Sequence, residues 1–346
     1  MSSNRRPPVG QTTSPTSVLA GMARWFEEQT EGRERFAWVL RDSLDELLDG
    51  QRTRRWCYQQ LNKTEKTHLG TKVELGLTIE FDILEGADLD WKIDGQEVDC
   101  KFSKDFGGWE IPMEMYLCND HEQSGTADHL ALLVWMNDDD DEWAAGVVQI
   151  RDDLLRFKTD GSGRRRRQYN RDNKRRLNDD GVNSVHWLWG GIQQLPPNLL
   201  RRTSEESRRA ILLNKSGQER MNALLREIQR EIINRQTLVT VAQQKDPMKR
   251  ARDARLSGHL GGERFLILGH QEADPHIARI LGLPVPGKGE LVSCRVVPAE
   301  RDVVRKVWLG DGWWRLAGAD EESGPSPDRD LYLRLGRQMI EDGPTA

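Results

Sequence analysis

The spacing of apolar residues changes several times along the chain and divides it into helical and extended segments. Apolar side chains recur every three or four positions in segments 17–49, 67–81, 216–233 and 237–244. This spacing predicts amphipathic helices. An uninterrupted apolar run at 129–136 predicts a central strand buried on both faces, and segment 143–150 predicts the strand after it. Helices and strands mixed in this way indicate an α/β fold.

A shorter pair of extended segments lies on either side of the dipeptide Asp94-Gly95. Residues 90–93 and 97–102 alternate polar and apolar side chains, and an Asp-Gly pair between two such runs predicts a β-hairpin. Successive side chains of a strand point to opposite faces, so Asp99 and Lys101 are expected to share one face of the second strand.

The predicted hairpin collects groups that suit hydrolysis of a phosphodiester. Asp90 and Asp99 supply two carboxylates, which with water and phosphate oxygens favour Mg²⁺ as a ligand set. Lys101 supplies an amine that can orient or deprotonate a water beside the metal. Glu74 lies beside the apolar stripe of helix 67–81, and a helix presenting it toward the hairpin would add a third ligand. The alternative is an ordinary solvated surface of charged side chains.

Length and composition indicate a soluble chain with room for two domains. The chain has 346 residues, of which 31% are charged and 36% hydrophobic. No apolar run reaches the roughly 18 residues that a membrane-spanning helix needs. Residues 1–16 are rich in Ser, Thr, Pro and Arg and predict a disordered tail. The four cysteines, Cys57, Cys100, Cys118 and Cys294, lack C-x-x-C spacing, which favours free thiols in a reducing cytoplasm.

The net charge of −5 hides a strong asymmetry. Residues 151–260 contain 25 Lys/Arg and 13 Asp/Glu, a local charge of +12, so the rest of the chain carries −17. A basic middle region in an acidic protein favours a polyanionic partner for that region. The alternative is a basic, solvated linker.

The basic region contains a pattern typical of a helix-turn-helix. The short helix predicted at 237–244 is followed by Asp246-Pro247, an N-cap and a first helical residue. The helix opened there carries four basic residues, Lys249, Arg250, Arg252 and Arg255. The second helix of such a motif enters the DNA major groove. Segments 265–268 and 291–297 supply strands for a winged variant; the alternative is a generic helical hairpin with a solvated basic face.

Several longer sequence words resemble those of the NaeI-type restriction endonucleases, the type IIE group. In the first half they are LDGQRT at 48–53, KTEKTHLGT at 63–71, VDCK at 98–101 and GGW at 107–109. In the second half they are LPPN at 195–198, SGQERMNAL at 216–224, FLILGHQ at 265–271 and LGLPVP at 281–286. The likeness covers roughly residues 20–300.

The resemblance implies a restriction-endonuclease-like mixed sheet flanked by helices, followed by a C-terminal winged helix-turn-helix domain. It implies a homodimer that hydrolyses double-stranded DNA with magnesium at GCCGGC or a related GC-rich palindrome. It also implies activation by a second bound copy of the site. Matching positions make Glu74, Asp90, Asp99 and Lys101 the catalytic set, with the three carboxylates as metal ligands. Leu89 stands where the commonest nuclease pattern of this kind has proline.

These patterns predict a domain order along the chain. Its parts are a tail at 1–16, an endonuclease domain at 17–160, a basic linker at 161–185, a winged-helix domain at 186–300 and an extension of unassigned role at 301–346. Two other functions stay open: a non-catalytic winged-helix DNA-binding regulator, and a nuclease of different specificity. The regulator would have no reason to hold Asp90, Asp99 and Lys101 together.

Overall fold

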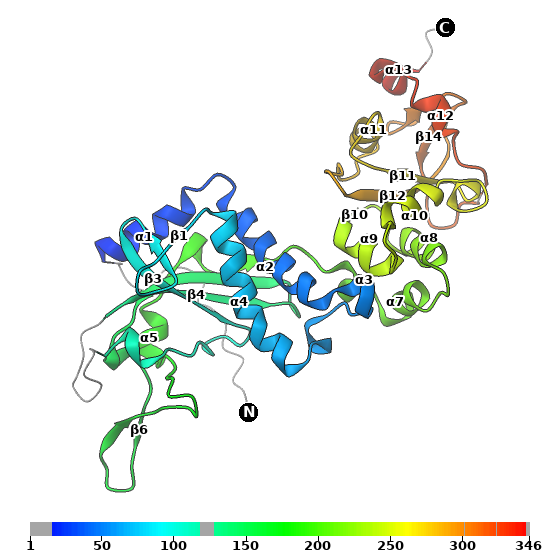
Figure 1. Ribbon diagram of the computed structural model, residues 1–346. Helices are drawn as coiled ribbons and strands as arrows, with labels where there is room; N and C mark the ends of the chain where they lie inside the picture. Colours follow the sequence, from blue (N-terminus) through cyan, green and yellow to red (C-terminus); the bar gives the residue numbers. More distant parts are fainter. Residues whose placement is uncertain (1–15, 118–127, 301, 323, 344–346) are drawn as a thin grey trace. The chain divides into compact units, whose positions relative to one another are not determined.

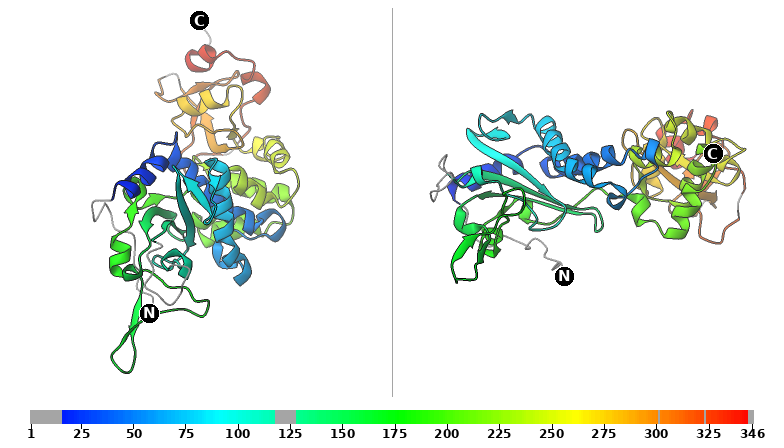
Figure 2. Two further views of the ribbon diagram at one scale, coloured as in Figure 1. Left: turned by 60° about the vertical axis from the view of Figure 1, so that its left-hand side comes forward. Right: turned by 60° about the horizontal axis from the view of Figure 1, so that its bottom comes forward.

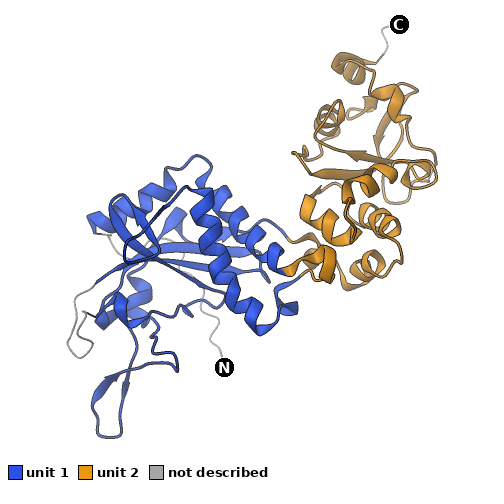
Figure 3. Cartoon of the chain, viewed as in Figure 1, with its two compact units in different colours: residues 1–47, 57–197 blue, residues 48–56, 198–346 orange. Residues whose placement is uncertain are grey.

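The computed structural model describes residues 16–117, 128–300, 302–322 and 324–343. The chain divides into two compact units (Figure 3). Unit 1 contains residues 1–47 and 57–197, and unit 2 contains residues 48–56 and 198–346. Apart from Thr16, the expected tail at 1–16 lies outside the described residues, as does Cys118. Cys100 and Cys294 are free thiols, and both of them and Cys57 are buried.

Unit 1 is built on a mixed sheet, as expected (Figure 1). Its strands follow the order β1-β2-β3-β4-β5-β8, and β9 pairs with β5. Their bounds are β1 Leu84–Glu85, β2 Trp91–Ile93, β3 Gln96–Ser103, β4 Leu130–Asn137, β5 Glu142–Gln149, β8 His186–Trp187 and β9 Gln193–Gln194. Strands β3 and β4 run parallel, whereas the other neighbours are antiparallel.

The sheet of unit 1 is covered on both faces, which explains the continuous apolar run of β4. Its helices are α1 Ser17–Glu27, α2 Gly32–Leu48, α4 Lys63–Glu80 and α5 Asp179–Asn183. On one face, Phe36 of α2 stacks on Trp143 of β5 with ring centroids 4.9 Å apart. On the other face, Leu133 and Trp135 of β4 pack against Trp109 and its neighbours. Alternate side chains of β4 therefore enter two different cores.

Helix α4 begins four residues before the segment predicted from apolar spacing. The side chain of Asn62 accepts a hydrogen bond from Glu65 N at 3.0 Å, and Glu65 Oε2 accepts one from Asn62 N at 2.9 Å. This reciprocal capping box satisfies the free N–H groups of the first turn. The polar residues 63–66 are therefore helical although they add nothing to the apolar stripe.

Residues 161–185, expected as a linker, belong instead to unit 1. Strands β6 Phe157–Thr159 and β7 Arg165–Arg167 form a hairpin that projects away from the rest of unit 1 (Figures 1 and 2). The chain then returns: Leu177 and Val185 are buried in the same core as Trp109. Isolated apolar residues in a polar stretch thus anchor this segment, and unit 1 extends to Pro197.

Unit 2 combines short helices with an antiparallel sheet in the order β10-β12-β14-β13, with β11 beside β12. Its helices are α3 Gly50–Thr53, α6 Leu199–Arg202, α7 Glu205–Leu212, α8 Gly217–Glu227, α9 Arg235–Ala242, α10 Pro247–Asp253, α11 Asp274–Ile280, α12 Arg329–Tyr332 and α13 Arg337–Asp342. Its strands are β10 Ile232–Ile233, β11 Phe265–Leu268, β12 Leu291–Pro298, β13 Val307–Trp308 and β14 Trp313–Leu316.

Helix α8 is shorter than the predicted helix 216–233. It ends at Glu227, and Ile228 has an extended backbone with φ −103° and ψ 101°. Strand β10 follows, in which Ile233 pairs with Leu291 of β12. The apolar residues at helical spacing therefore serve two elements, because pairing with a distant strand competes with continuation of the helix.

The expected order of short helix, turn and capped basic helix is present in α9 and α10. Gln243 ends α9 with a left-handed backbone, φ 53°. The side chain of Asp246 accepts a hydrogen bond from Lys249 N at 2.9 Å, and Pro247 is the first residue of α10. Both helices pack on α8.

The segment treated as an extension at 301–346 is part of the fold of unit 2. Trp314 of β14, Tyr332 of α12 and Ile340 of α13 are buried in one core together with residues of β11 and β12. Among the described residues, no helix combines the length and apolar character needed to cross a membrane.

Candidate active site

The predicted β2–β3 hairpin is present and is fastened to α4. Asp94 and Gly95 form its turn with φ of 49° and 78°, the positive values that a tight hairpin turn requires. Trp91 of β2 pairs with Val98 of β3, and both side chains are buried. Trp91 Nε1 donates a hydrogen bond to Thr78 Oγ1 of α4 at 2.8 Å. The apolar face of the hairpin is thereby held, which leaves the acidic face for chemistry.

Asp90, Asp99 and Lys101 converge on the acidic face. Lys101 Nζ forms an ion pair with Asp99 Oδ2 and lies 4.0 Å from Asp90 Oδ2. Asp90 Oδ2 also accepts a hydrogen bond from the backbone N–H of Cys100 at 2.8 Å. This last bond holds the carboxylate of Asp90, the residue just before β2, against the backbone in the middle of β3.

Burial gives Asp99 an unusual proton affinity. The residue is only 6% exposed, and burial raises the pKa of its carboxyl to about 7 although Lys101 acts in the opposite direction. The negative charge of Asp90 contributes to this rise in pKa. A buried carboxylate gains most from a nearby cation. Together with the carboxylate of Asp90, that of Asp99 forms an oxygen-only donor set that fits Mg²⁺.

The carboxyl of Glu74 is close enough to feel the charges of Asp90 and Lys101, but it does not form a metal-binding cluster with them in the described residues. Its side chain is half-buried on α4, and burial, followed by the charge of Asp90, raises the pKa of its carboxyl. Within the described part of the chain, no three His, Cys, Asp or Glu side chains are close enough to form a metal cage. A role for Glu74 as third ligand therefore stays a prediction.

Cys100 is excluded as a nucleophile by its position. It lies on the apolar face of β3 and is buried. Burial raises the pKa of its thiol well above the ordinary value, and the charges of Glu74 and Asp90 raise it further. A thiol that does not ionise is a packing residue rather than a reactive one.

One supporting residue was missed in the sequence analysis. The carboxylate of Glu97 accepts hydrogen bonds from the backbone N–H groups of Ala87 and Leu89 at 3.0 and 3.2 Å. These bonds shape the turn that delivers Asp90 to the site. The strand alternation that groups Asp99 with Lys101 also includes Glu97, so the signal was available.

The basic residues of unit 2 fall into two groups. Lys249, Arg250 and Arg252 lie on α10, where they form ion pairs with acids of the same helix or its cap, Asp253 and Asp246. The side chain of Arg252 is 62% exposed. The Lys249 side chain is also exposed, whereas the Arg250 side chain is 28% exposed and half-buried.

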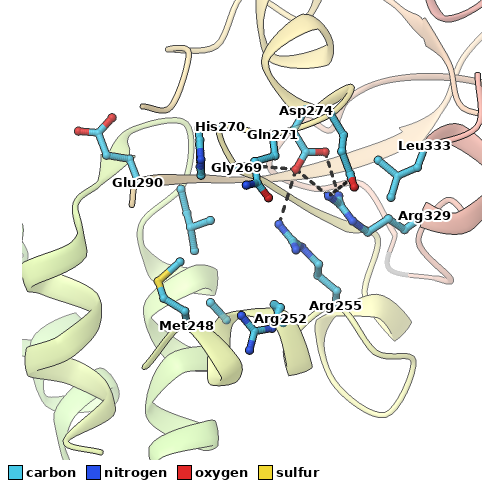
Figure 4. Close-up of a pocket in the computed structure, with 13 residues that line it drawn as sticks. Met248, Arg252, Arg255, Gly269, His270, Gln271, Asp274, Glu290, Arg329 and Leu333 are labelled. Carbon is cyan, nitrogen blue, oxygen red and sulfur yellow. Dashed lines mark hydrogen bonds and ion pairs between the residues drawn. The ribbon is translucent and has the colours of Figure 1, made fainter. Parts of the chain in front are cut away.

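Arg255 lies beyond the end of α10 and points inward. Its Nε and Nη2 donate to Ile267 O of β11 at 3.0 and 2.7 Å, and Nη2 lies 3.6 Å from Asp274 Oδ2. Figure 4 shows Arg255 and Arg329 both directed at Asp274. Asp274 is 1% exposed and accepts two hydrogen bonds of 2.9 Å from Arg329. Arg255 thus supports the fold of unit 2.

Two comparisons with known proteins show the family of the chain. The family described as restriction endonuclease NaeI matches residues 21–325, a range that includes both the β2–β3 hairpin and α10. The chain is also 42% identical over 274 residues to the type II restriction enzyme NaeI of Lentzea aerocolonigenes, covering 77% of this chain and 80% of that protein. The chain therefore belongs to the NaeI family of restriction endonucleases, type II enzymes that hydrolyse DNA.

Proposed function

We propose that this enzyme cleaves double-stranded DNA at GCCGGC or a related GC-rich palindrome, with magnesium held by Asp90 and Asp99. The observation that carries the proposal is the position of the Lys101 ammonium beside both carboxylates on one face of β3. A charged cluster of this kind is costly on a strand whose other face is buried, and a divalent ion with a phosphate would relieve that cost.

The residues of the site would divide the work between them. Asp90 and Asp99 would hold Mg²⁺, with Glu74 as a direct or water-mediated third ligand. Bound there, the ion would supply Lewis-acid stabilisation of the departing 3′ oxygen. Lys101 would orient the attacking water and offset negative charge that develops on the phosphorus oxygens. The water oxygen would bond to phosphorus opposite the 3′ oxygen as the water gives up a proton to solvent. The bond from phosphorus to the 3′ oxygen would break and that oxygen would take up a proton, which leaves a 5′ phosphate and a 3′ hydroxyl.

We further propose that unit 2 is a winged helix-turn-helix domain that binds DNA through α10. Lys249, Arg250 and Arg252 would contact groove and phosphates, and arginine paired with guanine suits a GC-rich site. Arg255 is left out of this set because its guanidinium is occupied by Ile267 O. A palindromic site matches a two-fold symmetric homodimer. One DNA copy would then be substrate and a second copy an activator.

The test is digestion of a plasmid that contains one GCCGGC site, with magnesium, with and without a short duplex carrying the same site. We expect a single linear product that forms faster when the duplex is added. A duplex of scrambled sequence and a reaction with chelator are the controls. Cuts at unrelated positions would indicate a nuclease of different specificity, and binding without any cut would indicate the non-catalytic regulator.

A further inference from the structure

The hairpin that projects from unit 1 carries a concentration of positive charge that the proposed function leaves unused. We call residues 156–176 the basic arm; it contains β6 and β7 (Figures 1 and 2). Within it are ten Lys/Arg and two Asp/Glu, a net formal charge of +8. Six of the cations are exposed: Lys158, Arg164, Arg165, Arg166, Arg171 and Arg176.

The arm has a defined conformation at its tip. The carboxylate of Asp160 accepts hydrogen bonds from Ser162 N, Ser162 Oγ and Arg164 N at 2.9, 2.6 and 3.1 Å. Asp160 also forms an ion pair with Arg166, and these contacts lower the pKa of its carboxyl to about 2. The tip is therefore held by one of the two acids that the arm possesses.

The base of the arm is fastened by a buried arginine. Arg175 is 1% exposed, and its backbone exchanges hydrogen bonds with Ile111 at 2.7 and 2.9 Å. Its guanidinium forms an ion pair with Asp152 and donates to Arg156 O at 3.0 Å. Ile111 lies eight residues after Ser103, the end of the strand that carries Asp99 and Lys101. The arm is thus attached next to the segment that leaves the active site.

Acids of the arm do not balance its exposed cations. Asp160 pairs with Arg166, and Asp172 lies 3.5 Å from Arg171. The nearby Asp152 is shared by Arg167 and Arg175. In the hairpin register, Lys158 stands directly opposite Arg166, and like charges at such positions destabilise a strand pair. A polyanion bound along the hairpin would remove this repulsion.

We propose that the basic arm binds the phosphate backbone of the substrate DNA, the same duplex that is cleaved beside Lys101. This inference rests on the proposed function. The arm is rich in arginine, whose planar guanidinium pairs with phosphate in two-pronged geometry. Backbone contacts of this type set the position of a protein on a duplex without reading sequence. The arm therefore contributes affinity and register, and no base specificity.

The experiment compares K158Q/R164Q with the matched control R24Q/R33Q, which removes two exposed cations from α1 and α2. Binding to a duplex with GCCGGC and to a scrambled duplex is measured over a range of salt, without magnesium. In the arm variant, the slope of log affinity against log salt should fall in magnitude by about 1.8, since each phosphate contact contributes about 0.9. The fall should be the same on both duplexes, and the control should match the parent protein.

Other outcomes distinguish failure of the proposal for the basic arm from failure of the proposed cleavage function. The proposal would be overturned if K158Q/R164Q had the same salt dependence of affinity as the parent protein. It would also be overturned if the salt dependence fell on the GCCGGC duplex alone. Neither result would contradict site-specific cleavage. Altered sedimentation with an unchanged slope would overturn it as well, since the arm would then dock on a second copy. The charge-conserving variant K158R/R164K should keep the parent slope, which distinguishes loss of charge from loss of the hairpin. A parent protein that binds neither duplex would refute the proposed function itself.

Discussion

At the level of single residues, the site depends on a balance between one ammonium and two carboxylates. Lys101 offsets the charge of Asp99, whose burial alone would favour the neutral acid. The same ammonium is within 4.0 Å of Asp90 Oδ2. A neutral side chain at this position would remove this ammonium from both carboxylates, and in the proposed mechanism it would also remove the group that orients the attacking water.

We predict that K101A greatly slows cleavage and keeps DNA binding. The loss in the single-turnover rate at saturating DNA should be about 10²–10⁴-fold, the range for a positioned proton-transfer group. The control is K92A, because Lys92 is exposed on β2 and lies outside the cluster. If K101A cuts at the parent rate, Lys101 has no part in the chemistry.

Asp45 of α2 offers a prediction on stability. Burial raises the pKa of its carboxyl from 3.8 to about 7, Arg41 lowers it, and Asp42 and Asp138 raise it. The folded state therefore holds a proton that the unfolded state releases between about pH 4 and 7, so stability from this group falls as pH rises through that window. Asparagine has the same size and carries no charge to bury.

We expect D45N to gain stability relative to the parent as pH rises from about 5 to 8, by about 1–3 kcal/mol in the free energy of unfolding. Urea denaturation at the two pH values measures this. D160N is the control: the pKa of the Asp160 carboxyl is about 2, so its ionisation does not change in this range. The stability of D160N relative to the parent should thus be equal at both values. A D45N difference independent of pH would show that Asp45 is ionised throughout.

At the level of elements, α10 combines two kinds of basic residue. Arg250 and Arg252 lie on the helix and pair with an acid of the helix and with its cap residue. Arg255 follows the helix and connects it to β11. The charge of these arginines does not tell a DNA-binding residue from a structural one, but the effects of substituting them should.

We predict that R250E/R252E weakens binding of the activating duplex and lowers the magnitude of its salt slope by about 2. Fluorescence anisotropy over a salt series provides both quantities. R255Q is the comparison: it should lower the unfolding temperature of unit 2, because Asp274 loses one of its two arginine partners. Intact activator binding by R250E/R252E would show that another element of unit 2 contacts DNA.

At the level of the whole molecule, each compact unit is built from two segments that are separated in the sequence. Residues 48–56 precede most of unit 1 in sequence but belong to unit 2. Within unit 2, Asn198 Nδ2 donates to Trp56 O at 2.6 Å, and the guanidinium of Arg208 lies 4.2 Å from the Trp56 ring centroid. Trp56 also packs on the core formed by α8 and α9. A fragment cut at residue 198 would lack this segment.

We predict that W56A destabilises unit 2 by about 2–3 kcal/mol, somewhat less than truncation of a fully buried aromatic residue. Hydrogen exchange should become faster in α7, α8 and α9 and stay unchanged in β3, β4 and β5. W38A is the control, since Trp38 is 39% exposed on α2. Equal acceleration in β3–β5 would mean that residues 48–56 support unit 1 instead.

Much of the site could be predicted from neighbouring residues alone. The Asp94-Gly95 turn, the alternation of β3 and the Asp246-Pro247 start of α10 each depend on only a few consecutive residues. The predicted hairpin already grouped Asp90, Asp99 and Lys101 into one cluster, and the structure brings these three together. Whether Glu74 completes a ligand set depends on how α4 packs against the hairpin, which no local pattern specifies.

Local spacing was sufficient wherever a single turn of helix or one hairpin decided the outcome, because the interactions involved lie within about four residues in sequence. Tertiary structure decided the rest. Helix α8 ends early because Ile233 pairs with Leu291, and Arg255 turns inward because Asp274 is buried behind it. The segments 48–56 and 161–185 joined unexpected units for the same physical reason: their apolar residues are buried by partners far away in the chain.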